Sequence, residues 1–375
     1  MASKLPGVME AFAELSDPRW RRCRYPLQEI LLSALCAVLC GVEDWESMSL
    51  WGKSQLGWLR DILPFANGIP SPDTYRRVFA ALNPHAFERC FIEWMSKLCP
   101  KLEGCHVAID GKAVRGSRTD EWAALHLVSA WCSTHGLTLG QMATADKSNE
   151  ITTIPVLLRA LELQGATVTI DAMGAQHEIA QTIMAGGADY VLSVKDNQPR
   201  LAEAIRQWFA AAGQGQLEHS YWEHIEHDKG HGRLETRICR VTDDVAWLVG
   251  IGQAWSGVRR LAMVESHRTV GGNTSVECRY FISSRACKAR EMAQLIRAHW
   301  GIENGLHWVL DVSWGEDACQ VRDRHAARNL ALLRKITLNL ARRGVSEGGK
   351  RLSLKNVRNL AAWDANYRNR LLGLA

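Results

Sequence analysis

Residues 106–112 read His-Val-Ala-Ile-Asp-Gly-Lys, and residues 166–171 read Ala-Thr-Val-Thr-Ile-Asp. Each stretch contains a short apolar run with β-branched residues, which is typical of a buried strand. Asp110 closes the first run and Asp171 closes the second. Burying a carboxylate costs several kcal/mol unless a partner compensates its charge. The two stretches therefore predict neighbouring strands of one sheet, with a cation-binding site where they end.

The chain around these stretches follows an α/β pattern from about residue 104. The strands that we expect are Cys105–Asp110, Leu125–Cys132, Leu137–Ala143, Thr167–Asp171 and Tyr190–Val194. The expected helices are Thr153–Leu163, Gln176–Ala185 and Pro199–Ala211. Short turns join the first three strands and favour antiparallel pairing, whereas the later strands alternate with helices and favour parallel pairing. The predicted fold is a mixed five-stranded sheet with helices on its faces.

The flanking regions have other patterns. Residues 1–100 read as helical, with helices from Leu27 to a stop at Gly41 and over Thr74–Leu82. Residues 216–286 read as a β-rich insertion; its expected strands are Glu235–Val241, Trp247–Ile251, Arg260–Val264 and Cys278–Ile282, with a hairpin loop at Gly271–Asn273. Helices at Ala289–Leu310 and His325–Arg342 follow. We therefore divide the chain into a helical domain (1–100), a core (101–215), the insertion (216–286), the completion of the core (287–345) and a basic tail (346–375).

Positive charge is concentrated toward the end of the 375-residue chain. Residues 319–375 carry 13 Lys/Arg and 3 Asp/Glu, whereas the 318 residues before them carry 32 Lys/Arg and 37 Asp/Glu. A basic end on a mildly acidic body indicates a polyanion partner, and Arg322 is among the expected contacts. The alternative is a pair of solvated basic helices.

Two groups of arginines in the helical region are typical of nucleic-acid contacts. The first alternates with Trp20 and Tyr25 and comprises Arg19, Arg21, Arg22 and Arg24. Arginine beside aromatic residues suits phosphate contact and stacking, although the stems could simply pack on the rings. Arg76 and Arg77 lie on the helix after the turn at residues 68–73, as in a helix-turn-helix reader. The alternative is an ordinary helix pair that reads no sequence.

The acids indicate phosphoryl transfer. Cleaving or joining a phosphodiester develops charge on the entering and the leaving oxygen, and two divalent ions about 3.5–4 Å apart can stabilise both. Mg²⁺ (or Mn²⁺) prefers oxygen ligands, so Asp110, Asp171 and a third acid predict a site for two ions. Glu303 is the favoured third acid. The other contenders lie close by in the sequence and are Asp311, Glu316 and Asp317.

Several polar residues near these acids are candidates for phosphate contacts. His299 and His307 share a helix face with Glu303, because they lie four residues before and after it. A plain polar face and a histidine-rich transition-metal site are the alternatives. The other candidates follow expected strands and are Lys112, Lys195, Asn197 and Gln198.

Composition excludes other classes of protein. The longest apolar stretch, Ile30–Val42, is shorter than the roughly 20 residues of a membrane span. The first residues contain no signal-peptide core, so we expect a cytoplasmic protein. The 11 cysteines form no Cys-x-x-Cys pair, and apolar contexts favour reduced side chains over a disulfide framework or a zinc site.

An ordered set of motifs gives the chain a resemblance to a known family. The motifs are Asp17-Pro-Arg19, Tyr25-Pro-Leu-Gln-Glu-Ile30, Gly68-Ile-Pro-Ser71, Thr74-Tyr-Arg-Arg-Val-Phe79, Ile109-Asp-Gly-Lys112, Asp171-Ala-Met-Gly-Ala-Gln176, Val194-Lys-Asp-Asn-Gln198, Lys229-Gly-His-Gly-Arg-Leu-Glu-Thr-Arg237, His299-Trp-Gly-Ile-Glu-Asn304, Leu306-His-Trp-Val-Leu-Asp-Val312 and Glu316-Asp-Ala318. Over nearly its whole length the chain resembles the insertion-sequence transposases of the H-repeat-associated family, within the DDE superfamily.

The resemblance implies an RNase H-like catalytic core and an acidic triad of metal ligands, with Glu303 as the third acid. It also shows a departure. The superfamily commonly places tyrosine and arginine seven and four residues before the glutamate and lysine four residues after it, where this chain has Ile296, His299 and His307. Asp196 is acidic where a small residue would leave more room for DNA.

We therefore expect a DNA transposase that cleaves strands at transposon ends and joins them to target DNA. Its partner would be double-stranded DNA, on which the protein would act as a homodimer or larger assembly, associated with the nucleoid. Two alternatives remain from other classes. One is a domesticated DNA-binding protein without transposition activity, and the other is a hydrolytic nuclease on the same core.

Overall fold

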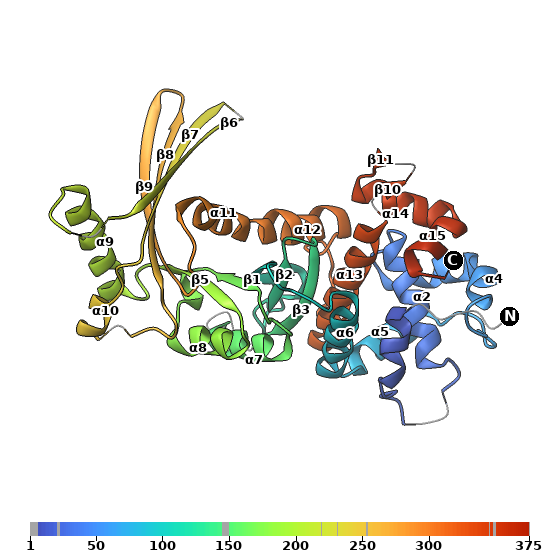
Figure 1. Ribbon diagram of the computed structural model, residues 1–375. Helices are drawn as coiled ribbons and strands as arrows, with labels where there is room; N and C mark the ends of the chain where they lie inside the picture. The colour runs from blue at the N-terminus through green and yellow to red at the C-terminus, as the bar shows by residue number, and fades with distance from the viewer. Residues whose placement is uncertain are drawn as a thin grey trace.

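The computed structural model describes residues 7–20, 23–144, 150–218, 220–230, 232–252, 254–344, 346–347 and 350–374. Arg21 and Arg22 lie outside the described residues. The molecule is elongated, with a sheet and a projecting β arm at one end and a helical unit at the other (Figure 1). Within the described residues, no helix has the length and apolar character to cross a bilayer.

The centre of the fold is one sheet of nine strands in the order β3-β2-β1-β4-β5-β9-β8-β7-β6. The strands are β1 (His106–Val114), β2 (Leu125–Cys132), β3 (Leu137–Ala143), β4 (Thr167–Ile170), β5 (Asp189–Val194), β6 (Trp222–Gly230), β7 (Arg233–Thr242), β8 (Arg260–Val270) and β9 (Asn273–Ser283). The predicted five strands are its first five, and their antiparallel and parallel pairings are confirmed. The expected number of five strands was wrong for the whole sheet, because β9 pairs with β5 and adds the strands of the insertion to the same sheet.

The pairing of β1 with β4 fixes the positions of the two aspartates. These strands are parallel neighbours whose last pair is Ile109 with Ile170, so Asp110 and Asp171 follow at the same level of the sheet. β1 does not end there, however. It continues to Val114 because β2 pairs with it along its whole remaining length. Asp110 therefore lies inside a strand, at the point where its other neighbour ends.

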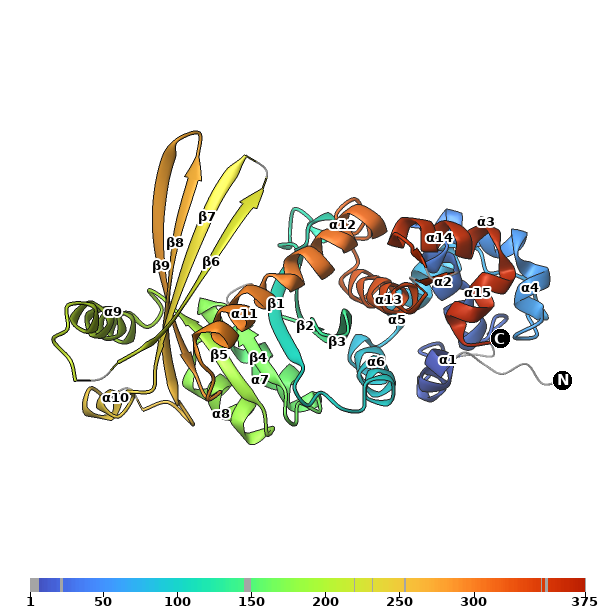
Figure 2. The ribbon, with the colours of Figure 1, turned by 45° about the horizontal axis from the view of Figure 1, so that its top comes forward.

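Helices cover both faces of the sheet around these aspartates. α7 (Glu150–Ala160) and α8 (His177–Ala185) lie on one face, and α11 (Ala289–His299) crosses the other above β1 and β4 (Figures 1 and 2). A short π-helical turn, Glu303–His307, joins α11 to α12 (Trp308–Trp314). The predicted continuous helix Ala289–Leu310 is thus interrupted at the glutamate.

The β arm consists of the outer parts of β6 to β9, which extend away from the core (Figure 2). Its strands carry few apolar residues and are joined by ion pairs, such as those of Arg240 with Glu223 (2.8 Å) and Glu265 (3.0 Å) on the neighbouring strands. The hairpin loop predicted at 271–273 is confirmed between β8 and β9. The strand predicted at Trp247–Ile251 is wrong, since residues 247–250 form the short helix α10 (Trp247–Gly250) beside α9 (Pro199–Gly213).

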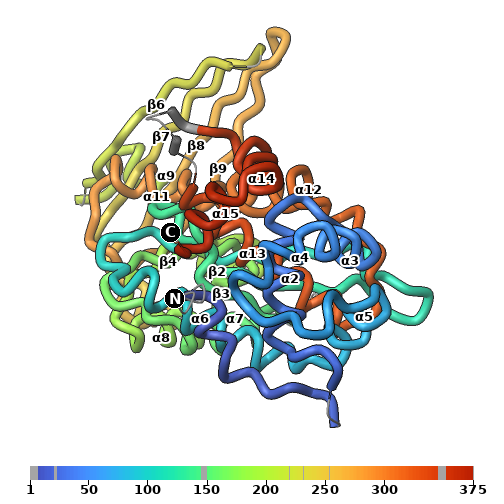
Figure 3. The backbone as a smooth tube through the Cα atoms, turned by 90° about the vertical axis from the view of Figure 1, so that its right-hand side faces the viewer, coloured from blue at the N-terminus to red at the C-terminus, as the bar shows by residue number. Residues whose placement is uncertain are grey.

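The helical unit contains segments from both ends of the sequence. Its helices are α1 (Gly7–Ala11), α2 (Leu27–Leu39), α3 (Trp45–Ser54), α4 (Leu56–Arg60), α5 (Pro72–Ala81), α6 (Pro84–Leu98), α13 (Arg324–Arg343), α14 (Leu354–Trp363) and α15 (Ala365–Leu372). Every residue of α2 except Gln28 is buried. α13 contacts α2, α5 and α6, and α14 packs against α2 (Figure 3).

Many basic residues near the end of the chain are buried in this unit. Arg334, Lys335, Arg358 and Arg368 are all at most 7% exposed. The Arg358 guanidinium lies 4.6 Å from the Trp314 ring centre, in reach of a cation–π contact. These positions correct the interpretation of the basic segment, because these side chains neither form a surface for a polyanion nor extend into solvent.

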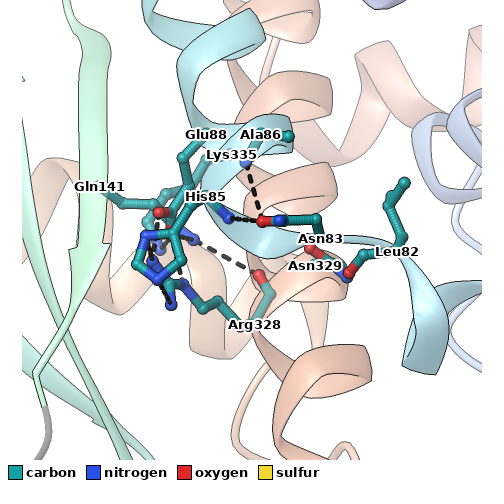
Figure 4. Close-up of polar contacts among 9 residues, drawn as sticks. All are labelled: Leu82, Asn83, His85, Ala86, Glu88, Gln141, Arg328, Asn329 and Lys335. Atoms are coloured by element: carbon teal, nitrogen blue, oxygen red, sulfur yellow. Dashed lines mark hydrogen bonds and ion pairs between the residues drawn. The ribbon is translucent and has the colours of Figure 1, made fainter. Parts of the chain in front are cut away.

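A buried polar junction joins the helical unit to the sheet (Figure 4). Arg328 of α13 makes a paired salt bridge to Glu88 of α6, with Nε to Oε1 at 2.7 Å. Gln141 of β3 donates to Glu88 (3.3 Å) and accepts from Lys335 (2.8 Å). Asn329 donates to two carbonyl oxygens at the end of α5. Charged groups that are paired in this way specify how the helices dock on the sheet, since an unpaired partner would be costly.

A candidate active site of three carboxylates

A cavity of about 240 Å³ lies where β1 and β4 meet the end of α11. Asp110, Asp171 and Glu303 all line it, although they come from a strand, a strand end and a π-helical turn. His299 and Lys195 also line this acidic pocket. The structure therefore brings together the three acids that the sequence singled out.

Asp110 lies partly buried in the acidic pocket. Its Oδ1 accepts a hydrogen bond from the Gly111 amide (2.9 Å). Burial raises its pKa to about 7, and the charges of Asp171, Glu303 and Glu150 act in the same direction. The pocket thus holds more negative charge than its protein groups compensate, so bound cations would be stabilised there.

The donor set fits hard divalent cations, because it consists of carboxylate oxygens. In the described part of the chain, the His, Cys, Asp and Glu ligand atoms that all lie within 4.8 Å of one another belong to other residues than these three acids. The ligand atoms of the three carboxylates therefore line one pocket but do not all lie within 4.8 Å of one another in the described structure.

Local structure holds Asp171 and Glu303 in place. Asp171 caps the 3-10 turn Ala172–Gly174 by accepting from the Gly174 amide at 3.3 Å. Glu303 begins the π-helical turn, and such turns occur often at functional sites because they displace one residue from the regular helix. This turn places Glu303 in the pocket with Asp110 of β1 and with Asp171, which follows β4.

The competing acids are occupied elsewhere. Lys112 donates to Glu316 (2.8 Å), Asp311 (2.5 Å) and Asp317 (3.4 Å). Neither Lys112 nor any of these three acids lines the acidic pocket. The structure thus differs from the expectation that Lys112 holds a DNA phosphate, because its ammonium group is paired with Asp311, Glu316 and Asp317.

His299 is held by a chain of hydrogen bonds beneath the pocket. Its Nδ1 lies 2.9 Å from the Thr169 hydroxyl, which lies 2.8 Å from Nε2 of His106. His106 continues the chain to the Ser133 hydroxyl at 3.0 Å. Burial lowers the pKa of His299, and it lowers that of His106 to about 4. Both rings are therefore neutral near pH 7, and His299 is oriented by its neighbours.

His307 lies beside Asp110. Its Nδ1 is 3.4 Å from Asp110 Oδ2, and burial lowers its pKa to about 3. The neutral ring can therefore act toward Asp110 as a hydrogen-bond partner, not as a cation. Since His299 contacts Thr169 and His307 contacts Asp110, the histidines do not form the transition-metal cluster that was one alternative.

The residues after β5 have two kinds of position. Lys195 is exposed and lines the acidic pocket. Asn197 donates to the carbonyl oxygen of Ala172, and Gln198 donates to that of Ala175 (3.1 Å). These two amides tie the loop after β5 to the loop that carries Asp171, so they position the site from outside it.

The described arginines of the helical region differ in their contacts. Arg19 is bonded to Asp17 (2.6 Å) and to the Tyr25 carbonyl (2.7 Å), and Arg24 lies over the Tyr25 ring. Arg76 and Arg77 are exposed on α5 and share Asp73. Arg322 is exposed just before α13.

A larger groove adjoins the acidic pocket and was not predicted. It has a volume of about 690 Å³, runs between α11 and the β arm, and shares Arg279, Ile296 and Trp300 with the pocket. Its arginines come from four elements and are Arg233, Arg237, Arg268, Arg279 and Arg297. The groove forms because the strands of the β arm pair with one another next to α11, and the sequence contains no local pattern that predicts the pairing of strands so far apart.

A buried pair beside Asp110 was also missed. His126 of β2 contacts Glu150 at the start of α7, and a side chain at Gly111 would collide with both. Glycine at position 111 is therefore needed for this close approach. The only signal in the sequence was the Asp-Gly pair itself.

Comparison with known proteins agrees with this geometry. Residues 101–340 match the transposase DDE domain family, and residues 9–95 match the family described as DDE_Tnp_1-associated. The chain belongs to the family of transposases with a DDE domain, which confirms the resemblance.

Two relatives extend over almost the whole chain. A candidate H repeat-associated transposase of Escherichia coli K12, YhhI, is 37% identical over 97% of this chain and 97% of its own length. A candidate transposase of Escherichia coli O157:H7, YncI, is 39% identical over 95% of this chain and 93% of its own. Among solved structures, the piggyBac transposase synaptic complex with hairpin DNA aligns with 98% of this chain and 77% of that chain, at 11% identity and a TM-score of 0.44, a likeness too distant to carry an argument.

Proposed function

We propose that this transposase cleaves DNA strands at the ends of its element and joins them to target DNA. The observation that supports the proposal most directly is the convergence of Asp110, Asp171 and Glu303 in one pocket. Their elements are separated by up to 193 positions in the sequence, so folding alone brings them together. The mixed pairing of the strands β3-β2-β1-β4-β5 and the helices on both faces of the sheet also support an RNase H-like core.

The three carboxylates are the groups that would hold two Mg²⁺ (or Mn²⁺) ions. When bound, such ions stabilise the charge that develops on the attacking and the leaving oxygen of a phosphodiester. The protein contributes the positions of the ligands: the β1–β4 register aligns Asp110 with Asp171, and the π-helical turn presents Glu303. A nearby cation would stabilise the deprotonated form of Asp110, whose pKa is raised to about 7 by burial.

Double-stranded DNA is the proposed substrate and partner. Lys195 at the pocket can hold a phosphate next to the reacting bond, and the groove arginines can follow the backbone toward the β arm. The groove glutamates Glu226, Glu235 and Glu277 are paired with arginines in the free protein, so bound phosphates would compete for those guanidinium groups. Arg76 and Arg77 on α5 are proposed as contacts of the helical unit. We further propose a homodimer or larger assembly on DNA, because two element ends must be joined to one target.

The test is a cleavage assay in Mg²⁺ on duplexes that carry the terminal sequences of the element. Asp110→Asn, Asp171→Asn and Glu303→Gln should each abolish strand cleavage while DNA binding persists. Asp311→Asn is the decisive comparison, because Asp311 lies eight residues after Glu303 but contacts Lys112. Full cleavage by the Glu303 variant, or its loss only in the Asp311 variant, would refute the assignment of the third acid.

The same assay separates the alternative classes. A DNA-binding protein without activity would bind the ends but give no cleavage with any divalent ion. A hydrolytic nuclease would cut but give no product in which an element end is joined to target DNA. Exposed Glu178→Gln on α8 serves as a control for a neutralised carboxylate outside the pocket.

A further inference from the structure

Three soft metal-binding side chains meet on the side of the core next to α6, outside the acidic pocket. Cys105, Cys132 and His135 bring one ligand atom each to within 4.8 Å of one another. Sγ of Cys105 lies 3.5 Å from Nε2 of His135. Both cysteines are buried free thiols, whereas His135 is exposed. Among the described residues, these three are the His, Cys, Asp or Glu side chains whose ligand atoms all lie within 4.8 Å of one another.

The backbone explains why they converge. Cys132 is paired with Val107 across β1 and β2, so Cys105, just before β1, lies close to it. The chain then reverses in a tight turn that ends at Gly136, whose φ of +67° is in the region that favours glycine. The Gly136 amide donates to the Cys132 carbonyl (2.8 Å) and closes the turn around His135. A Cys-x-x-His turn thus faces a third ligand from another segment.

We propose that Cys105, Cys132 and His135 form a second metal site that binds one thiophilic ion, of which Zn²⁺ is the best match. Thiolate and imidazole are soft ligands that select such ions over Mg²⁺. Zinc binds sulfur at about 2.3 Å and nitrogen at about 2.0–2.1 Å in tetrahedral geometry, which separates the two ligand atoms by about 3.5 Å. The Cys105–His135 distance has this value without any movement.

Solvent can reach the site from the side of His135. Exposed His135 leaves a route for the ion, and three protein ligands leave one coordination position for water.

Its position links the site to the catalytic core. His106 follows Cys105 and Ser133 follows Cys132, and these two residues form the lower part of the hydrogen-bond chain to His299. A metal ion would cross-link the two segments that carry them. We expect bound Zn²⁺ to stabilise the native protein, and the site needs no part in the transfer chemistry itself.

A metal-free alternative accounts for the same short distance. A thiol of Cys105 could donate a hydrogen bond to His135, and no ion would then bind. Direct binding measurements distinguish the two. Purified full-length protein is stripped with a chelator in the presence of a reductant, titrated with Zn²⁺ alone, and followed by metal analysis after gel filtration. Co²⁺ is added in parallel, because a thiolate–cobalt charge-transfer band reports sulfur ligation that carboxylates cannot produce.

The variants are chosen so that folding does not decide the outcome. His135→Ala removes an exposed ligand, Cys105→Ser removes a buried one, and Cys278→Ser on β9 is the matched control at an exposed free cysteine. We expect one Zn²⁺ per chain in the wild-type and Cys278 proteins, a cobalt–thiolate band in both, and a rise in the thermal midpoint with Zn²⁺. The His135 variant should fold with an unchanged metal-free midpoint, lose the band and bind Zn²⁺ at least ten-fold more weakly. The absence of stoichiometric Zn²⁺ on the wild-type protein, or equal binding by the His135 variant, would overturn the proposal.

Discussion

Nζ of Lys112 lies 2.8 Å from Oε2 of Glu316, and the Glu316 side chain is 1% exposed. The pair joins β1, two residues beyond Asp110, to the segment that follows α12. It therefore fixes the strand that carries Asp110 to the far end of α12, the helix that begins directly after the π-helical turn of Glu303. A lysine that the sequence suggests as a DNA contact instead holds two parts of the site together.

Glu316→Gln should destabilise the protein without removing a group from the acidic pocket. Burial alone would raise the pKa of Glu316, but Lys335, Lys112 and Arg334 lower it, so its contribution to stability is present near pH 7 and is lost as the pH falls through its lowered pKa. Removing the charge leaves Lys112 with Asp311 and Asp317 alone and takes from Lys335 the carboxylate that stabilises its charge most, at a cost of up to about 3–5 kcal/mol. Denaturant unfolding measures the change, with exposed Glu178→Gln as control. A change of less than about 0.5 kcal/mol in the free energy of unfolding would contradict a stabilising role of the Glu316 charge.

Asp110→Asn should stabilise the protein in EDTA at pH 8. The pKa of Asp110 is raised from its ordinary 3.8 to about 7, so the folded state binds the extra proton between these values and stability falls as the pH rises through them. The asparagine amide does not ionise, so the variant keeps this part of the free energy of unfolding, which is on the order of 2–4 kcal/mol above pH 7. Thermal unfolding at pH 5 and pH 8 should show the difference widening at the higher pH. Added Mg²⁺ should raise the wild-type midpoint and narrow the gap. Equal thermal midpoints of the wild-type and Asp110→Asn proteins in EDTA at pH 8 would show that the ionised Asp110 carboxylate does not destabilise the folded state.

Thr169→Val should slow cleavage through the position of His299. The valine keeps the shape of the side chain but removes the hydroxyl that bridges His299 and His106. We expect about a ten-fold lower cleavage rate, since a lost buried hydrogen bond is worth about 1–3 kcal/mol. Thr169→Ser retains the hydroxyl and should restore most of the rate, which separates the hydrogen bond from packing. A serine variant as slow as the valine variant would argue against the relay.

Replacing Arg76 and Arg77 by alanine should weaken DNA binding and its salt dependence. Each lost phosphate contact reduces the slope of log K against log salt by about 0.9. Arg206 on α9 is a matched control, because it is exposed and paired three residues away with Glu203, as Arg76 is with Asp73. Arg206→Ala should leave the slope unchanged. If Arg206→Ala reduces the slope as much as the replacement of Arg76 and Arg77 does, the effect comes from the net charge of the protein and not from a DNA contact of α5.

The elements near the aspartates could be predicted well because local patterns determine them. Leu125–Cys132 and Leu137–Ala143 form strands with the predicted bounds, since both are apolar runs ended by turns. β6 could not be predicted, because its sequence Trp222–Gly230 has no apolar period and its partners come from other strands. Likewise, the pairing of β5 with β9 depends on contacts about 90 residues apart, which no local pattern encodes.

The candidate site could be predicted only in part for a related reason. The identities of Asp110, Asp171 and Glu303 follow from motifs, but the fate of charged residues depends on their neighbours in space. Lys112 and Arg358 read as solvent-facing charges in the sequence, yet one contacts three acids and the other lies on Trp314. Charge counts therefore overestimate the surface available to DNA.

The packing of α14 on α2 has a consequence for how the chain is made. Leu354 emerges from the ribosome 315 positions after Leu39, so at about 5–20 residues per second α2 waits roughly 15–60 s for this partner. During that time an almost wholly apolar helix lacks part of its cover. Any chain that stops short of Leu354 leaves it uncovered permanently. We therefore expect the helical unit to be more accessible to chaperones and proteases until α14 has been translated.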